Sequence, residues 1–206
     1  FTDRRQRQMC IRDRYYVPEK IITNNDLEKL MDTSDEWITS RTGIKQRHSV
    51  GDNPLGPSDL AVESTKKLFD KIDVKLEDID FVIFATSSPD TYVPGSGSIF
   101  QHKMGLNNIG VLDIRQGCCG FVYAISVADQ FIKAGTYKNI LVVGSEVQTT
   151  QLDYDTKGRG TAIIFGDGAT SALVRPTKSK GKGILSSHLH SDGKYISELG
   201  LSLIHI

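Results

Sequence analysis

The stretch that decides the fold is Asp113-Ile114-Arg115-Gln116-Gly117-Cys118-Cys119-Gly120-Phe121. It predicts that a short apolar strand ends, a tight turn follows, and a long apolar helix begins. A cysteine in such a turn faces the free N–H groups and the positive end of the helix dipole, a field that favours thiolate over thiol. Gly117 and Gly120 flank the cysteines and permit a tight backbone. We therefore expect Cys118 to be the nucleophile of an acyl-transfer reaction.

Other roles for the cysteines fit this pattern less well. A small, buried, unreactive cysteine is the alternative for Cys118 and the preferred interpretation of Cys119. Adjacent cysteines cannot easily share one tetrahedral metal ion, and the sequence has no second pair, so no metal site is expected there. With Cys10 the chain has three cysteines, an odd and sparse set that makes no disulfide framework and favours a reducing cytoplasm.

Outward from this turn, short apolar runs typical of buried strands alternate with segments of helical periodicity. Strands are predicted over 81–86, 110–114, 139–145, 161–165, 169–175 and 183–190, and helices over 24–31, 33–38, 58–72, 96–104 and 121–133. This alternation predicts an α/β fold with a mostly parallel sheet and helices on both faces. Gly166-Asp167-Gly168 predicts a tight hairpin turn between two of the strands.

The composition excludes several functional classes. The 206 residues are 38% apolar, enough for a domain with a real core. Lys plus Arg number 25 and Asp plus Glu number 25, so net charge gives no case for binding nucleic acid or an anionic membrane. No apolar run approaches the roughly 20 residues of a membrane helix, and no segment resembles a secretory signal. We expect a cytoplasmic protein.

Four further segments carry recognisable motifs. They are 32–38 (Asp-Thr-Ser-Asp-Glu-Trp-Ile), 41–47 (Arg-Thr-Gly-Ile-Lys-Gln-Arg), 158–161 (Gly-Arg-Gly-Thr) and 166–169 (Gly-Asp-Gly-Ala). Together with the block around Cys118, they resemble the β-ketoacyl-acyl carrier protein synthase III family of thiolase-like condensing enzymes. The resemblance extends from Tyr15 to Tyr195, although Arg115-Gln116 departs from the small residues of the best-known bacterial members and leaves the subfamily open.

The resemblance implies a coenzyme A site. In this family a tryptophan and the following arginine sandwich the adenine, and Trp37 and Arg41 would take those positions. An indole face and a guanidinium plane both stack on a base. Arg159 would touch a nucleotide or carrier phosphate. The alternatives are a core tryptophan, a surface ion pair for Arg41 and a solvated loop charge for Arg159.

The resemblance also implies the activity. An acyl group from acyl-CoA would be loaded onto Cys118 and condensed with malonyl-acyl carrier protein by decarboxylative Claisen condensation, which starts fatty acid synthesis. The backbone N–H of Cys118 would be one oxyanion-hole donor. No metal or redox cofactor is expected, and the full-length protein would be a homodimer. The family's catalytic His and Asn lie in a second half that this chain lacks, so we expect the chain alone to be inactive.

Two other interpretations stay open. One is a sibling condensing enzyme, for head-to-head long-chain acyl condensation, hydroxymethylglutaryl-type synthesis, or polyketide or quinolone priming. The other is a catalytically inert, binding-only fragment. His188 and His190 would face one side of the strand predicted over 183–190, but a metal site there would need a third ligand that the sequence does not offer.

Segment 88–94 resembles the family's dimer loop, whose residue before proline reaches into the neighbouring subunit's acyl channel. Acetyl-preferring members have phenylalanine at that position, and this chain has Val93. We therefore expect a pocket wider than an acetyl group, unless Tyr92 fills the space. The alternative is a valine packed beneath its own subunit.

The two ends differ from the interior. Residues 9–14 (Met-Cys-Ile-Arg-Asp-Arg) and 201–206 (Leu-Ser-Leu-Ile-His-Ile) resemble translations of the two strands of one transposon end used to fragment DNA for sequencing. We expect 1–14 and 201–206 to be non-native. The resemblance then makes 15–176 the N-terminal half of a two-half, thiolase-like fold, and 177–200 the start of the C-terminal half. A basic arm and an apolar strand are the alternatives for the two ends.

Overall fold

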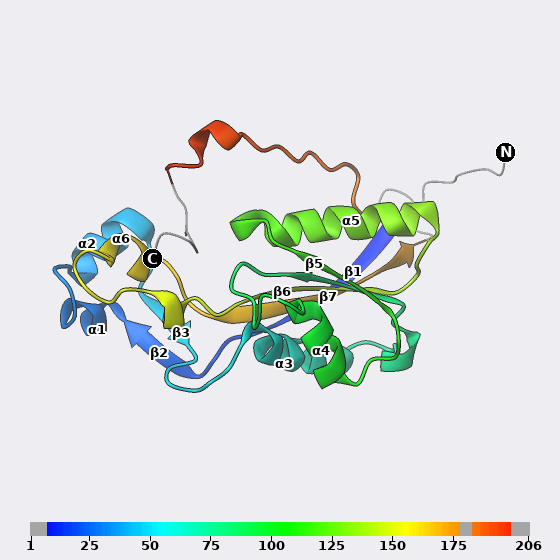
Figure 1. The fold of residues 1–206 in the computed structure, drawn as a ribbon, viewed down its shortest axis with the longest axis horizontal. Helices are drawn as coiled ribbons and strands as arrows, with labels where there is room; N and C mark the ends of the chain where they lie inside the picture. Colours follow the sequence, from blue (N-terminus) through cyan, green and yellow to red (C-terminus); the bar gives the residue numbers. More distant parts are fainter. Residues whose placement is uncertain (1–7, 178–182, 199–206) are drawn as a thin grey trace.

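The computed structural model describes residues 8–177 and 183–198, and its centre is one five-stranded sheet (Figure 1). Across the sheet the strands are β1 (Gln8–Tyr16), β7 (Gly168–Thr177), β6 (Ile140–Glu146), β4 (Phe81–Ala85) and β5 (Gly110–Ile114). β4 pairs in parallel with β5 and β6, while β7 is antiparallel to β6 and β1. Every strand except β7 therefore points the same way, which confirms the prediction of a mostly parallel, mixed sheet.

Helices cover both faces of this sheet, as predicted (Figure 1). α5 (Gly120–Ala134) lies on one face, and α3 (Pro57–Phe69) and α4 (Ser96–Met104) lie on the other. Successive residues of β4 point to opposite faces, so Ile83 packs against α5 while Phe84 packs against α3 and α4. Both side chains are fully buried, which accounts for the unbroken apolar sequence of the strand.

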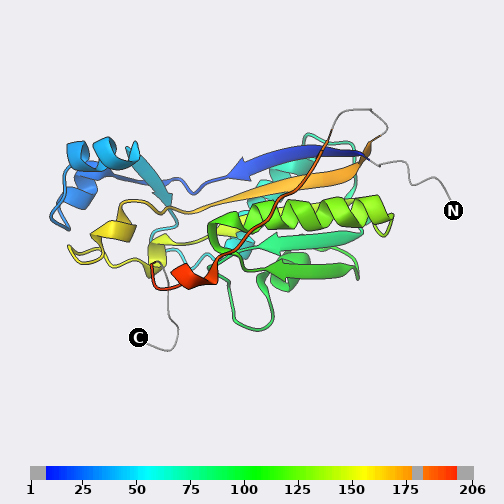
Figure 2. The same cartoon turned by 90° about the horizontal axis from the view of Figure 1, so that it is seen from above.

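A smaller lobe lies beyond the carboxyl ends of β4, β5 and β6 (Figures 1 and 2). It contains the antiparallel pair β2 (Lys20–Thr23) and β3 (Gln46–Ser49) with the short helices α1 (Asn24–Glu28), α2 (Asp35–Thr42) and α6 (Arg159–Ala162). Leu27, Ile38 and Ala162 are fully buried in its core. Segments 20–49 and 159–163, far apart in the chain, thus pack together beside the sheet.

Four 3₁₀ turns complete the described elements: η1 (Leu76–Asp78), η2 (Gly117–Cys119), η3 (Thr149–Gln151) and η4 (Gly193–Tyr195). No helix in the described part of the chain is long and apolar enough to cross a membrane. Residues 8–14, predicted to be non-native, form most of β1 opposite β7. That pairing does not test their origin, and the segment 201–206 lies outside the described residues.

Two predicted strands are wrong. Residues 159–162 form α6, because both edges of β7 are already occupied by β1 and β6 and leave no place for a strand over 161–165. Ala162 and Ile163 are buried in the lobe instead. Residues 184–192 have no regular secondary structure, so the strand predicted over 183–190 is also absent.

Candidate active site

The turn between β5 and α5 has the strand–turn–helix geometry that the sequence predicts. A hydrogen bond from Thr86 N to Ile114 O (3.1 Å) continues the β4–β5 pairing to the last residue of β5. The chain then reverses at Gly117, whose φ of 50° lies in the left-handed region that favours glycine. Cys119 N donates to Gln116 O (3.2 Å), which closes the 3₁₀ turn. Cys118 therefore lies in this turn, one residue before Cys119, the N-cap of the 15-residue α5.

Close packing fixes the start of α5 against the sheet. A Cβ atom at Gly144 of β6 would lie 2.9 Å from the ring of Phe121, too close for any side chain larger than hydrogen. The ring thus occupies the space that glycine leaves free. This contact holds the first turn of α5, and with it Cys118, at the carboxyl ends of the parallel strands.

Both cysteines of the turn are exposed. Within residues 8–177 and 183–198, no group accepts a hydrogen bond from the Cys118 N–H. That N–H can therefore donate to a developing oxyanion, as the oxyanion-hole role requires. The preferred interpretation of Cys119 as a buried cysteine is wrong, since the open end of α5 exposes it.

Glu146, which the sequence analysis missed, joins the ends of β4 and β6 beside this turn. Its carboxylate accepts hydrogen bonds from Ser87 N (2.7 Å), Ser87 Oγ (2.8 Å) and Ser88 Oγ (2.7 Å). Ser88 Oγ in turn accepts from Val147 N (2.9 Å). These bonds position the strand ends that surround Cys118, and no sequence motif marks them.

Asp167 has a different role from the one predicted. The Gly-Asp-Gly-Ala segment is structural, but it is the entrance to β7 and not a hairpin. Asp167 is 5% exposed, and its carboxylate accepts hydrogen bonds from Val50 N (2.8 Å), Gln148 N (2.8 Å) and Thr149 N (2.9 Å). Asp167 therefore joins the lobe, which ends near Val50, to the segment that follows β6.

The three residues predicted to hold coenzyme A lie together in the lobe. The Arg41 guanidinium carbon is 4.3 Å from the centroid of the Trp37 ring, and that of Arg159 is 4.5 Å from it. Ser34 caps α2 by accepting from Trp37 N (3.0 Å), and Arg159 donates to the backbone carbonyl of Asp32. The indole is half-buried against the core of the lobe. It is thus part of that core and at the same time a platform for two cations.

The loop between β4 and α4 places its tip near the nucleophile turn. Tyr92 is 72% exposed, and its ring lies 5.3 Å from the guanidinium of Arg115, three residues before Cys118. Val93 is 84% exposed, so the alternative in which Val93 packs beneath its own subunit is wrong. Asp113 of β5 accepts a hydrogen bond from Gly97 N (3.0 Å) at the start of α4.

Asp113 lies on the exposed edge strand, yet its carboxyl group is partly shielded from water. This burial raises the pKa of Asp113, and the charge of Asp90 raises it further, while the hydrogen bond from Gly97 N opposes both.

His188 and His190 do not form a ligand pair. Both are exposed, and without the predicted strand they share no face of a sheet. No cluster of three or more His, Cys, Asp or Glu side chains suited to a metal ion occurs among the described residues.

Comparison with known proteins agrees with this geometry. A family model described as 3-oxoacyl-[acyl-carrier-protein (ACP)] synthase III matches residues 112–193, which include Cys118 and Arg159. Over 86% of its length the chain is 46% identical to β-ketoacyl-[acyl-carrier-protein] synthase III of Caldanaerobacter subterraneus subsp. tengcongensis, and equally identical to synthase III 1 of Bacillus anthracis. The chain is therefore similar to the β-ketoacyl-acyl carrier protein synthase III family along most of its length.

Solved structures of synthase III enzymes have the same fold as this chain. The crystal structure of the Thermus thermophilus synthase III matches 93% of this chain with a TM-score of 0.86 and 36% identity. The chain covers 53% of the Caldanaerobacter relative and 58% of the Thermus chain, so it spans about half the length of these synthases. The thiolase-like α/β fold predicted from the sequence is thereby confirmed.

Proposed function

We propose that the complete protein containing this chain is a β-ketoacyl-acyl carrier protein synthase III that transfers an acyl group from acyl-CoA to Cys118. The observation that carries the proposal is the position of Cys118, exposed in the turn that leads into α5, with its own N–H free of a partner in the described residues. A nucleophile and an oxyanion donor thus belong to one residue.

The reaction has two stages. In the first, Cys118 Sγ attacks the thioester carbonyl carbon, the carbonyl oxygen accepts a hydrogen bond from Cys118 N–H, and coenzyme A leaves as its thiolate. In the second, malonyl-acyl carrier protein loses CO₂, and the resulting enolate attacks the acyl carbon. A carbon–carbon bond forms and the Cys118 thiolate leaves. The His and Asn that stabilise this enolate in the family would come from the second half of the protein.

Trp37 with Arg41 and Arg159 is proposed to bind the adenine and phosphates of coenzyme A. Both guanidiniums now lie directly on the indole, and separations of 4.3 and 4.5 Å leave no room for a base between the planes. A base can therefore stack on Trp37 only when one cation moves aside. Among the described residues the exposed Arg41 donates only to Trp37 O in its own helix (3.3 Å), whereas Arg159 is held across the lobe at Asp32, so Arg41 is proposed to move.

The proposal includes the cellular context expected from the sequence. The complete protein would be a cytoplasmic homodimer that needs no metal or redox cofactor and uses malonyl-acyl carrier protein as its second substrate. Sibling condensing enzymes share the fold and differ in the acyl groups they accept, so substrate range decides between these candidates.

The test is a condensation assay with the complete protein. We expect repeated release of CO₂ and free thiol only when an acyl-CoA and malonyl-acyl carrier protein are both present, and a single equivalent of thiol from acyl-CoA alone. We expect no condensation by the 206-residue chain alone. Turnover with malonyl-CoA or a second long-chain acyl-CoA in place of the carrier substrate would instead assign a sibling enzyme. Condensation by the chain alone at the rate of the complete protein would contradict the roles given to the second half.

Val93 is expected to set the width of the acyl pocket. Burial contributes about 0.8 kcal/mol for each methylene, so a larger side chain that excludes two methylenes lowers the preference for long donors by roughly tenfold or more. In the complete protein, we expect Val93→Phe to reduce the ratio of kcat/KM for octanoyl-CoA to that for acetyl-CoA by this factor. A wild-type preference for acetyl-CoA, or an unchanged ratio in the variant, would show that Val93 does not set the width of the acyl pocket.

A further inference from the structure

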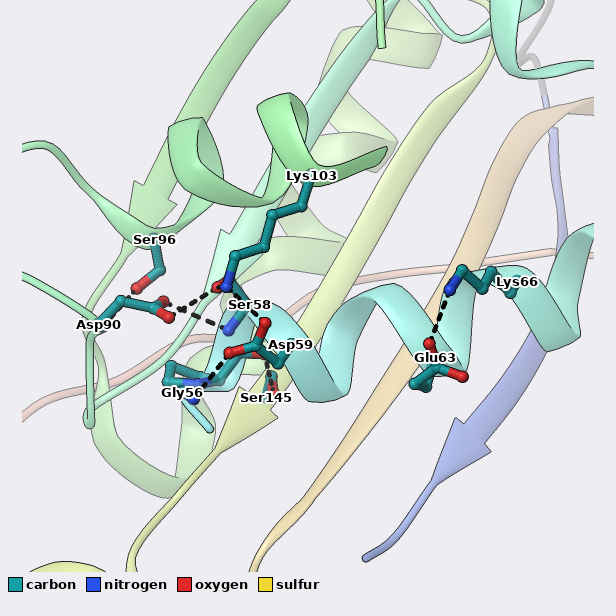
Figure 3. Close-up of polar contacts among 10 residues, drawn as sticks. Gly56, Ser58, Asp59, Glu63, Lys66, Asp90, Ser96, Lys103 and Ser145 are labelled. Carbon is teal, nitrogen blue, oxygen red and sulfur yellow. Dashed lines mark hydrogen bonds and ion pairs between the residues drawn. The ribbon is translucent and has the colours of Figure 1, made fainter. Parts of the chain in front are cut away.

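A cluster of polar side chains attaches the loop that carries Tyr92 and Val93 to the body of the molecule (Figure 3). The Asp90 carboxylate accepts hydrogen bonds from Ser58 Oγ (2.6 Å) and Ser58 N (3.2 Å) in the first turn of α3. Asp90 N donates to Ser96 Oγ (2.9 Å) at the start of α4. One aspartate thus joins this loop to two helices.

The cluster is continued by a lysine from α4. Lys103 Nζ donates to Ser58 Oγ (2.8 Å) and forms an ion pair with Asp59 Oδ1 (2.5 Å), each side chain being about one-third exposed, at 33% and 31%. Ser145 Oγ donates to Pro57 O (2.7 Å), which attaches the same end of α3 to β6 (Figure 3). The loop is therefore fixed to the sheet through the N-terminus of α3.

The packing shows that Asp90 has a dedicated site. A Cβ atom at Gly56 would lie 2.1 Å from Asp90 Oδ1, so only glycine at this position allows the carboxylate to reach α3. Ser58 and Ser96 are both 0% exposed. Water can therefore replace Asp90 as the hydrogen-bond partner of their hydroxyl groups only if the structure opens locally. Residues 91–94, in contrast, are all exposed.

We propose that Asp90 is a positioning residue for acyl-chain selectivity. It fixes the position of the loop tip, Tyr92 and Val93, relative to α3 and α4. The tip has few contacts of its own beyond the stacking of Tyr92 with Arg115 and the bond from Thr91 Oγ1 to Pro94 O (2.7 Å). Its position is therefore set by the anchor at Asp90. This inference rests on the proposed function, because selectivity has meaning only for an acyl-transferring enzyme.

The experiment compares Asp90→Ala, Asp90→Asn and a matched control, Asp80→Ala. Asp80 is equally half-buried and accepts Lys138 N (2.8 Å) and Asn139 N (3.1 Å), but it precedes β4, at the end of that strand far from the loop. Amide hydrogen exchange is measured in the 206-residue chain. We expect exchange over 91–97 to accelerate at least about fivefold in Asp90→Ala and to stay near wild type in Asp80→Ala.

The second measurement uses the complete protein and kcat/KM for octanoyl-CoA and acetyl-CoA. Asp90→Ala is expected to change their ratio by about fivefold or more, while Asp90→Asn, which keeps an oxygen for Ser58 Oγ, restores most of it. Asp80→Ala should lower both constants in equal proportion if it lowers them at all. A merely structural Asp90 would behave like Asp80.

Each outcome decides something different. Unchanged exchange over 91–97 in Asp90→Ala overturns the positioning claim whatever the enzyme does. Faster exchange with an unchanged selectivity ratio overturns the link to selectivity. If the complete protein does not condense acyl-CoA, the proposed function fails and the selectivity claim fails with it, while the exchange data still decide whether Asp90 holds the loop.

Discussion

In Cys118→Ala, we expect the acyl-enzyme to disappear completely, whereas Cys119→Ala should retain it. Both thiols are exposed, so accessibility does not separate them. Position does, because Cys118 has the unpartnered N–H within the described residues, while Cys119 N is used inside the turn by Gln116 O. An acyl group on Cys118 can therefore pass through a stabilised tetrahedral intermediate, and one on Cys119 cannot.

The measurement is intact-protein mass spectrometry of the complete protein after incubation with octanoyl-CoA, followed by peptide mapping of residues 113–121. Loss of the thiol removes the nucleophile itself, so no residual adduct is expected. Acylation retained in Cys118→Ala and lost in Cys119→Ala would assign the nucleophile to the neighbouring residue and invalidate the alignment with the synthase III family.

In Trp37→Ala, we expect affinity for coenzyme A to weaken by about 2 kcal/mol or more, since the substitution removes the ring on which the base is proposed to stack. Arg41→Ala should cost about 1–3 kcal/mol, as the loss of a charge-assisted contact does. Trp37→Phe keeps an aromatic face and should recover part of the affinity. Isothermal titration of the complete protein with coenzyme A gives these values.

A cation elsewhere on the surface provides the control. Lys67 lies 4.9 Å from the ring of Tyr16, a comparable contact away from the lobe, and Lys67→Ala should leave affinity unchanged. Trp37 is the only tryptophan among these 206 residues, so in this chain the quenching of its fluorescence by coenzyme A reports directly on the site. Unchanged affinity in both Trp37→Ala and Arg41→Ala would return these residues to a structural role.

The sequence was sufficient to predict helices and strands for which local sequence signals and burial agree. The apolar run of β4 and the stop of α4 at Gly105, which has a φ of 66°, were predicted because both depend on a few neighbouring residues. Residues 161–165 have strand-forming composition, but strand formation also needs a free sheet edge. β1 and β6 occupy both edges of β7, so tertiary pairing overrides local preference.

The residues of the candidate site also fall into those that local sequence predicts and those that depend on tertiary contacts. Cys118 was predicted from a continuous segment, whereas the approach of Arg159 to Trp37 across more than a hundred residues followed only from resemblance to a family. Glu146 was missed because its partners Ser87 and Ser88 lie 59 and 58 residues away in the sequence. Asp167 was missed as an anchor because its partners are largely backbone N–H groups of distant loops. Such partners have no residue type, so no sequence pattern reports them.

The buried carboxylate of Asp167 makes the lobe and the sheet one cooperative unit. Separating them would leave the N–H groups of Val50, Gln148 and Thr149 and a buried charge without partners. This connection joins the lobe that carries Trp37 to the sheet that carries the turn of Cys118. The position of Trp37 relative to Cys118 is therefore supported by the Asp167 carboxylate together with two neighbouring hydrogen bonds, from Asp167 N to His48 O (2.9 Å) and between Ser49 Oγ and Thr149 Oγ1 (2.8 Å).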